Sequence, residues 1–209
     1  MGYPSLVVVL WFYGPKSQAE KAWELMLDPS LDPDFKQAVI IPADRLNDSD
    51  DVGCVMGSRR PGVGMRIKRL NTAAFYEIWD LWLEFGQNEG AEASIILMGR
   101  FSKKKSLEAS DDATAFSHFH RGIVYEVRVA PTYTDENLDR DATDFTSKVR
   151  DILAQKCRDL GKIRAYPAGT GFYEPLENIF GGEVRVQKFL SIKRKCDPGN
   201  YWGIFFDLI

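Results

Sequence analysis

FSHFHRGIVYEVRVA, residues 116–130, is the longest strand candidate in the chain, and the rest of the fold can be read outward from it. Successive side chains of a strand point to opposite faces of the sheet. One face of this stretch carries apolar side chains, at Phe119, Ile123, Tyr125, Val127 and Val129. The other face carries His118, His120, Val124, Glu126 and Arg128. The pattern predicts a strand with one face under helices and a second, open face.

Two further strands are predicted at PGVGMRIKRL (61–70) and SIILMGRF (94–101). In the first, Val63, Met65 and Ile67 share the buried face, which leaves Arg66 and Lys68 on the other face. In the second, the apolar residues predicted to point inward are Ile95, Leu97 and Phe101. The residues left for its open face are then Ser94, Ile96, Met98 and Arg100.

The remaining elements alternate between strand-like and helix-like patterns. Short buried strands are predicted at 6–13 and 38–43, and helices near 17–26, 72–85, 139–160 and 182–195. The basic residues Lys193, Arg194 and Lys195 suit the C-terminal end of the last helix. This order predicts an α+β fold, a broad and mainly antiparallel sheet with helices packed on one face. We expect residues 1–209 to form a single domain.

Composition excludes several classes of function. The net charge of −3 argues against a nucleic-acid-binding protein, which normally has a strong basic excess. The three cysteines have no CxxC spacing, so a disulfide framework is not expected. We expect the protein to lie in the reducing environment of the cytoplasm. The apolar run at 6–13 is too short to span a bilayer, and no membrane association is expected.

If the three central strands are neighbours, their open faces form one mixed, basic surface. The candidates on it are Arg66, Lys68, Met98, Arg100, His118, His120, Glu126 and Arg128. Such a surface fits a pocket for an oxygen-rich or anionic small molecule, with histidine as the proton carrier near neutral pH. The alternatives are a solvated sheet face and a homodimer interface with ion pairs. A metal at His118-x-His120 would need a third ligand, which the spacing does not supply, so no metal site is expected.

The loop AYPAGTGFYEP, residues 165–175, is a second candidate for contact with a ligand. Its two glycines let the backbone approach a ligand closely. Tyr166, Phe172 and Tyr173 add apolar surface and hydroxyl groups. The alternative is a connection between helices that covers an edge of the core.

Three stretches resemble berberine bridge enzyme-like oxidoreductases, particularly the fungal members. DDATAFSHFHRG (111–122) is similar to that family's "TAF.HR" strand, and LVVVLWFYGPKSQAEKAW (6–23) to the strand, glycine and helix that begin its substrate domain. The segment 164–202, which ends in KRKCDPGNYW, resembles the family's closing helix and turn. The resemblance implies the substrate-binding C-terminal half of that fold, with substrate in front of the sheet.

The resemblance does not extend to the domain with which the family binds its flavin. The family binds FAD through an N-terminal domain, commonly with covalent bonds from a histidine and a cysteine, and this sequence has no counterpart of either motif. Tyr166-Pro167 stands where the family has an asparagine–tyrosine pair near the flavin. We therefore expect no bound cofactor. Hydride abstraction would need an electron acceptor that the flavin normally supplies.

Three hypotheses for the function follow. The first is a cofactor-independent enzyme of secondary metabolism that promotes a redox-neutral cyclisation, a Diels–Alder-type cycloaddition or an isomerisation of a hydrophobic polyketide- or terpenoid-like substrate. Arg66, Arg100, His118, His120 and Tyr166 would be the hydrogen-bond donors, with Met98 and Phe172 as walls. The second is a binding subunit, or half of a split FAD-linked oxidoreductase. The third is a remnant that dimerises through the sheet. The sequence favours the first.

Overall fold

The computed structural model describes residues 4–48, 56–113, 125–157, 165 and 174–203. The chain forms two compact units, which divide between Met56 and Gly57. The second unit contains the sheet and the long helices, and the first contains only short helices. Whether 1–209 act as a single domain stays a prediction.

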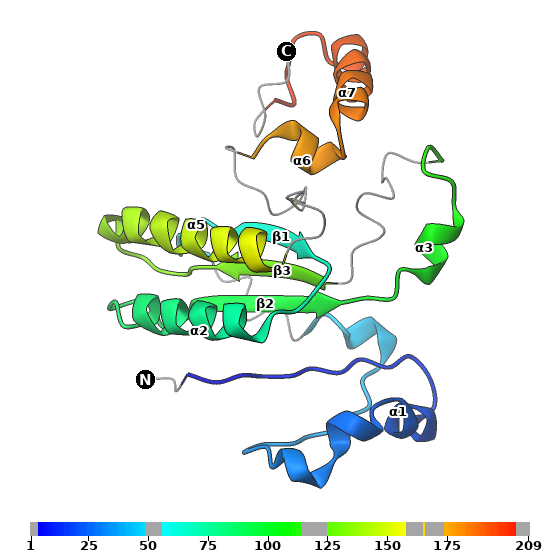
Figure 1. Ribbon diagram of the computed structural model, residues 1–209, viewed down its shortest axis with the longest axis vertical. Coiled ribbons are helices and arrows are strands. Elements are labelled where there is room, and N and C mark those ends of the chain that lie inside the picture. Colours follow the sequence, from blue (N-terminus) through cyan, green and yellow to red (C-terminus); the bar gives the residue numbers. More distant parts are fainter. Residues whose placement is uncertain (1–3, 49–55, 114–124, 158–164, 166–173, 204–209) are drawn as a thin grey trace. The chain divides into compact units, whose positions relative to one another are not determined.

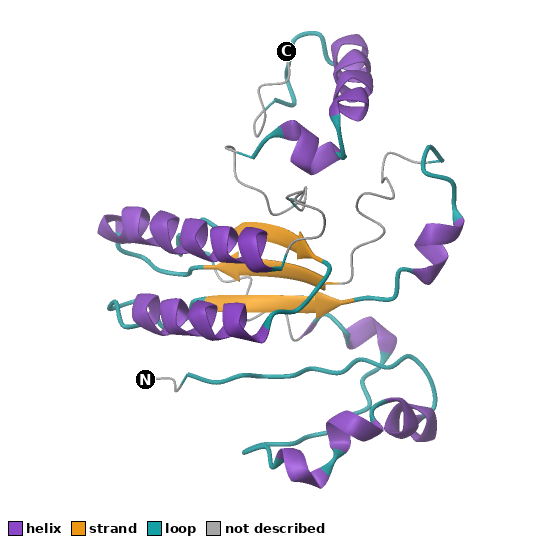
Figure 2. Cartoon of the chain, in the orientation of Figure 1, coloured by secondary structure: helices purple, strands orange, loops and turns teal. Residues whose placement is uncertain are grey.

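The described sheet has three strands in the order β1-β3-β2. They are β1 (Val63–Ile67), β2 (Ile95–Arg100) and β3 (Tyr125–Ala130). Both pairings are antiparallel, with β3 in the centre (Figure 2). The predicted α+β class and the antiparallel sheet are confirmed, and all three strands lie in stretches predicted as strands.

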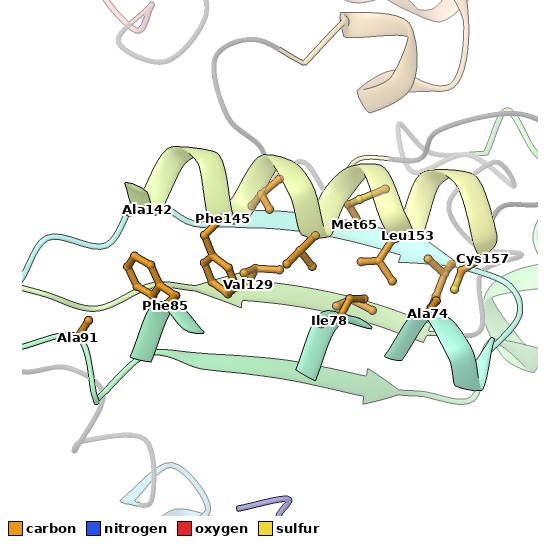
Figure 3. Packing of buried hydrophobic residues seen from close by; sticks show 14 of the residues in the cluster. Met65, Ala74, Ile78, Phe85, Ala91, Val129, Ala142, Phe145, Leu153 and Cys157 are labelled. Carbon is orange, nitrogen blue, oxygen red and sulfur yellow. The ribbon is translucent and has the colours of Figure 1, made fainter. Parts of the chain in front are cut away.

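Two long helices, α2 (Thr72–Gly86) and α5 (Asp139–Lys156), lie side by side along the sheet (Figure 1). Their buried residues form one core with the inward side chains of β1 and β3 (Figure 3). Within it, the rings of Phe85 and Phe145 stack, with their centroids 4.9 Å apart. Both helices match predicted helices, because apolar residues recur along each of them at helical spacing. The Asn71 side chain caps α2 by accepting a hydrogen bond from the Ala74 N–H.

The C-terminal helices are α6 (Leu176–Phe180) and α7 (Glu183–Cys196), and a short helix α3 (Lys104–Glu108) follows β2. α7 confirms the predicted last helix with its basic final turn. Asp197 stabilises the turn that follows α7. Its carboxylate accepts hydrogen bonds from the Tyr201 and Trp202 N–H groups and from Lys193. The hydrogen bond from Lys193 is the largest of the effects that lower the pKa of Asp197.

The first unit differs from the sequence prediction. It contains α1 (Lys16–Ala22) and the 3-10 turns η1 (Glu24–Leu27), η2 (Pro29–Leu31) and η3 (Ala43–Arg45). The strands predicted at 6–13 and 38–43 are wrong, since neither stretch is in a strand and both are largely exposed. A strand is stable only when a neighbour satisfies its backbone groups, and within the described residues neither stretch has such a neighbour. Leu6 is 82% exposed and Ile40 is 88% exposed.

Candidate functional site

The strand register divides the sheet into two faces. Residues directly opposite each other on neighbouring strands share a face. Val63, Met65 and Ile67 pair with Val129, Val127 and Tyr125, and this face belongs to the core with α2 and α5. The other face is called here the open face, and it carries Arg66, Glu126, Arg128, Leu97 and Ile95. The sequence placed the first three of these residues correctly.

The register corrects the predicted orientation of β2. Met98 lies opposite Val127 and Arg100 lies opposite Tyr125, so both residues share the face of α2 and α5. The Arg100 guanidinium lies 5.8 Å from the centroid of the Tyr125 ring. The prediction was wrong because Ile95–Met98 are all apolar, so alternation does not identify the inner face. Only the pairing with β3 decides it.

A charge cluster lies at the centre of the open face. The Oε1 atom of Glu126 accepts hydrogen bonds from Arg66 Nη2 at 2.9 Å and from Lys103 Nζ at 3.2 Å. The side chains are largely withdrawn from solvent, with 2% of Arg66, 20% of Lys103 and 23% of Glu126 exposed. These three residues carry two positive charges and one negative charge. Hydrogen bonds that involve charged groups are stronger than neutral ones, so the two cations hold Glu126 firmly, and the three residues together carry a net positive charge.

Phe101 forms an aromatic wall beside the charge cluster. It continues the alternation of Leu97 and Gly99, and its ring lies over Gly99, where a Cβ would come within 2.8 Å of the ring atom Cε2. The ammonium group of Lys103 lies 5.5 Å from the centroid of this ring. The glycine therefore leaves room for the ring beside the cation. Phe101 is 61% exposed and Leu97 is 51% exposed, so this side of the open face is apolar and accessible.

The sequence prediction missed Lys103, Phe101 and Leu97 as site residues. Phe101 and Leu97 were assigned inward with the wrong face of β2. Lys103 lies just beyond the strand, in a run of three lysines where composition alone does not distinguish one from another. The glycine at position 99 was the available signal, since a glycine within a strand often marks the close approach of another group.

Five predicted site residues lie outside the described residues: His118, His120, Tyr166, Phe172 and Tyr173. Their roles stay predictions. The neighbouring Ala165 is described, and it forms an isolated antiparallel bridge with Met65 on β1. Lys68 lies one residue beyond the end of β1 and is exposed. The described part of the chain contains no cluster of three or more histidine, cysteine or acidic residues that suits a metal.

A hollow of about 390 Å³, away from the charge cluster, is lined by Arg59, Pro61, Tyr133, Asp139 and Thr143. Its polar groups bind one another. Asp139 accepts hydrogen bonds from Arg59 Nε at 2.7 Å and from the Tyr133 hydroxyl at 2.8 Å. Burial, followed by the hydrogen bond to Asp139, raises the pKa of Tyr133 to about 12. Since these groups are already paired, the hollow is a structural link between the start of the second unit and α5.

Cys157 is the buried cysteine of the second unit, at the end of α5. Burial is the largest effect on its thiol and raises its pKa. Since the thiolate is the nucleophilic form, this cysteine is suited to packing and not to catalysis.

Comparisons with known proteins agree with this fold. No family model matches the sequence, and no curated protein matches it. Among solved structures, the wild type and a single-substitution variant of Physcomitrella patens BBE-like 1 each superimpose with a TM-score of 0.53 at 16% sequence identity. At this identity the likeness concerns the fold alone. The chain therefore shares a BBE-like fold.

The matched region is a part of those proteins. It covers 72% of this chain and 31% of the matched chains. The chain thus spans about a third of the length of these BBE-like structures. None of the helices in the described residues is long and apolar enough to cross a membrane.

Proposed function

We propose that the open face binds a small hydrophobic metabolite and promotes its redox-neutral cyclisation, by a Diels–Alder-type cycloaddition or an isomerisation. The observation that carries the proposal is the combination of a desolvated cationic cluster with an exposed apolar wall on one sheet face. Reactions of this kind need a shaped surface that holds a reactive conformer. They also need hydrogen-bond donors that polarise a carbonyl as charge develops on it.

The described residues divide between these two tasks. Lys103 is the donor that a ligand can reach, because the Arg66 side chain is 2% exposed, and Glu126 holds both cations in position through its Oε1 atom. Phe101 and Leu97 supply the apolar wall. We further propose that His118, His120 and Tyr166 add donors, and that Lys68, Phe172 and Tyr173 line the same space. Met98 and Arg100 take no part, because they share the face of α2 and α5.

Native mass and a visible absorption spectrum of the purified protein test this function first. We expect a colourless protein without flavin mass that converts a linear polyketide- or terpenoid-like substrate into a product of identical mass. A yellow protein with flavin bound, and a product two hydrogens lighter than its substrate, would instead point to oxidase chemistry.

Lys103→Ala is expected to weaken binding of an anionic aromatic probe, 1-anilinonaphthalene-8-sulfonate, by about tenfold. The variant removes one of the two cations next to Glu126, and a hydrogen bond to a charged group contributes about 1.5–3 kcal/mol. Fluorescence titration measures the dissociation constant. Lys105→Ala is the matched control, because Lys105 is exposed and pairs with Glu108 on α3. Equal affinity in the two variants would place the probe elsewhere.

Gly99→Ala is expected to weaken the same binding about as much as Phe101→Ala does. Its Cβ would displace the Phe101 ring, which is exposed and can rotate away, so stability should fall by less than about 1 kcal/mol. Gly86→Ala is the control, since a Cβ there meets nothing within 4 Å and alanine favours the helix. The role assigned to the ring is wrong if Gly99→Ala binds the probe like wild type while Phe101→Ala does not.

A second function, as one half of a split FAD-linked oxidoreductase, is supported by a different observation. The first unit has no buried residue among residues 4–48, and the apolar side chains of 6–9 are all more than half exposed. Extended apolar surface of this kind is typical of a site for another protein. Co-purification of this chain with a flavoprotein would favour this function over the first, provided that the chain is colourless after the two are separated.

A further inference from the structure

Arg128 is a further cation on the open face, outside the charge cluster. It lies in the central strand β3, two residues beyond Glu126 and on the same side of the sheet. Its side chain is exposed, and the described part of the chain offers it no hydrogen bond or ion pair. The guanidinium group is always charged and has five N–H donors in a planar fork. Arg128 can therefore bind an anionic group of a ligand.

The charges on the open face are not balanced. Among the three described strands, Glu126 is the one acidic side chain on this face, and its Oε1 atom already accepts hydrogen bonds from Arg66 and Lys103. Arg128 thus has no acidic partner on the strands beside it. It is also the most accessible of these cations, since the Arg66 side chain is 2% exposed and that of Lys103 is 20% exposed. A ligand with one negative charge would complement this face.

The residues opposite Arg128 on the two neighbouring strands differ in character. On β1 the opposite residue is Gly64, which has no side chain. On β2 it is Leu97, which is 51% exposed. The apolar surface continues from Leu97 to Ile95 in one direction and to the Phe101 ring in the other. At about 3.3 Å per residue, this surface extends for about 13 Å along β2. An extended apolar chain can therefore lie next to the guanidinium group.

We propose that Arg128 anchors a carboxylate, and that the substrate of the open face is a hydrophobic carboxylic acid with an extended, conjugated chain. The inference rests on the proposed function, whose substrate class it specifies. The guanidinium fork matches the two oxygens of a carboxylate and binds them as a pair. The chain of the acid then lies along Leu97 and Phe101, and Lys103 remains the donor toward a carbonyl of the substrate. A head group with two or more negative charges fits less well, because Glu126 on the same face repels it.

Fluorescence titration of the full chain with cis-parinaric acid, a conjugated polyene acid, and with its uncharged methyl ester tests the anchor. We expect wild type to bind the ionised acid about tenfold more tightly than the ester. Arg128→Gln should weaken binding of the acid about tenfold and leave binding of the ester within about twofold, which also shows that the variant is folded. Arg128→Lys should fall between the two, since it keeps the charge but loses the fork. Arg140→Gln is the matched control, because Arg140 is an exposed arginine on α5 that no described residue pairs with.

The outcomes separate this inference from the function on which it rests. Equal affinity of wild type for the acid and the ester would overturn the carboxylate anchor and leave the proposed function standing, because the face would then bind the apolar chain alone. A preference for the acid that persists in Arg128→Gln and disappears in Lys103→Ala would also overturn it, since Lys103 would be the anchor. If wild type bound neither compound, the open face would not be a site for small hydrophobic molecules, and the inference and the proposed function would fail together.

Discussion

Glu174→Ala is expected to lower the free energy of unfolding by about 3–5 kcal/mol, because it removes one partner of a buried ion pair. The Glu174 side chain is 2% exposed. It accepts hydrogen bonds from Arg150 Nε at 3.1 Å and Nη2 at 2.9 Å, and from Asn178 Nδ2 at 2.7 Å. The truncation leaves the Arg150 guanidinium, itself 18% exposed, without this partner. Chemical denaturation followed by circular dichroism measures the loss.

Glu177→Ala is the matched control for Glu174. It lies on the first turn of α6, is exposed, and should change the free energy of unfolding by no more than about 0.5 kcal/mol. Glu174→Gln should fall between the two, since the amide still accepts hydrogen bonds but carries no charge. If Glu174→Ala and Glu177→Ala lose equal stability, the ion pair contributes nothing measurable to the fold.

The Glu174 contacts also connect the helices to the edge of the site. Arg150 lies on α5, and Glu174 ties it to Asn178 on α6. The carbonyl of Asn178 in turn accepts a hydrogen bond from the N–H of Ala165, which bridges to Met65 on β1. These contacts connect Arg150, Glu174, Asn178 and Ala165 with Met65 on β1. The ion pair and the Ala165 bridge therefore belong to one set of contacts.

The elements that the sequence predicted well are those whose pattern has one interpretation. α2 and α5 carry apolar residues at helical spacing over four or five turns, and their burial follows this pattern. In β1 the apolar residues Val63, Met65 and Ile67 alternate with Gly64 and Arg66, although all five residues are buried. The helix bounds differ from the prediction by few residues, because helix ends depend on local capping.

The predictions failed where the structure of a segment depends on a partner that is distant in the sequence. The runs at 6–13 and 38–43 have the composition of buried strands, yet in the described residues they have no strand to pair with. Composition indicates that a segment can form a strand, and only pairing makes it one. The inner face of β2 failed for a related reason, because the register with β3 is a tertiary property.

The candidate site was predicted only in part, because some of its contacts also depend on the tertiary structure. Arg66 and Glu126 interrupt apolar alternation in β1 and β3, so the sequence placed them on the open face. Lys103 reaches Glu126 from beyond the end of β2, 23 residues away along the chain. No repeating pattern in the sequence predicts that contact. The electropositive character of the face was predictable, but its geometry was not.

Phe145→Ala is expected to lower the free energy of unfolding by about 3–5 kcal/mol, the range typical of removing a buried aromatic side chain. Phe145 is 5% exposed, and its ring stacks on Phe85 with an angle of 4° between the ring planes. The contact joins α5 to α2, so the truncation leaves a cavity between the two helices that cover the sheet (Figure 3). Thermal or chemical denaturation measures the effect. Tyr76→Ala on α2 is the control, since its side chain is 70% exposed.

The variant Phe145→Ala also tests whether the stability of the fold and ligand binding on the open face are independent. The core that holds Phe145 lies on the face of β1 and β3 opposite Arg66 and Glu126. Below its midpoint of unfolding, Phe145→Ala should therefore bind the anionic aromatic probe with the affinity of wild type, whereas Lys103→Ala should be stable but bind it weakly. If Phe145→Ala loses probe binding in step with Lys103→Ala while still folded, the two faces of the sheet are not independent, and the probe binds in the core layer.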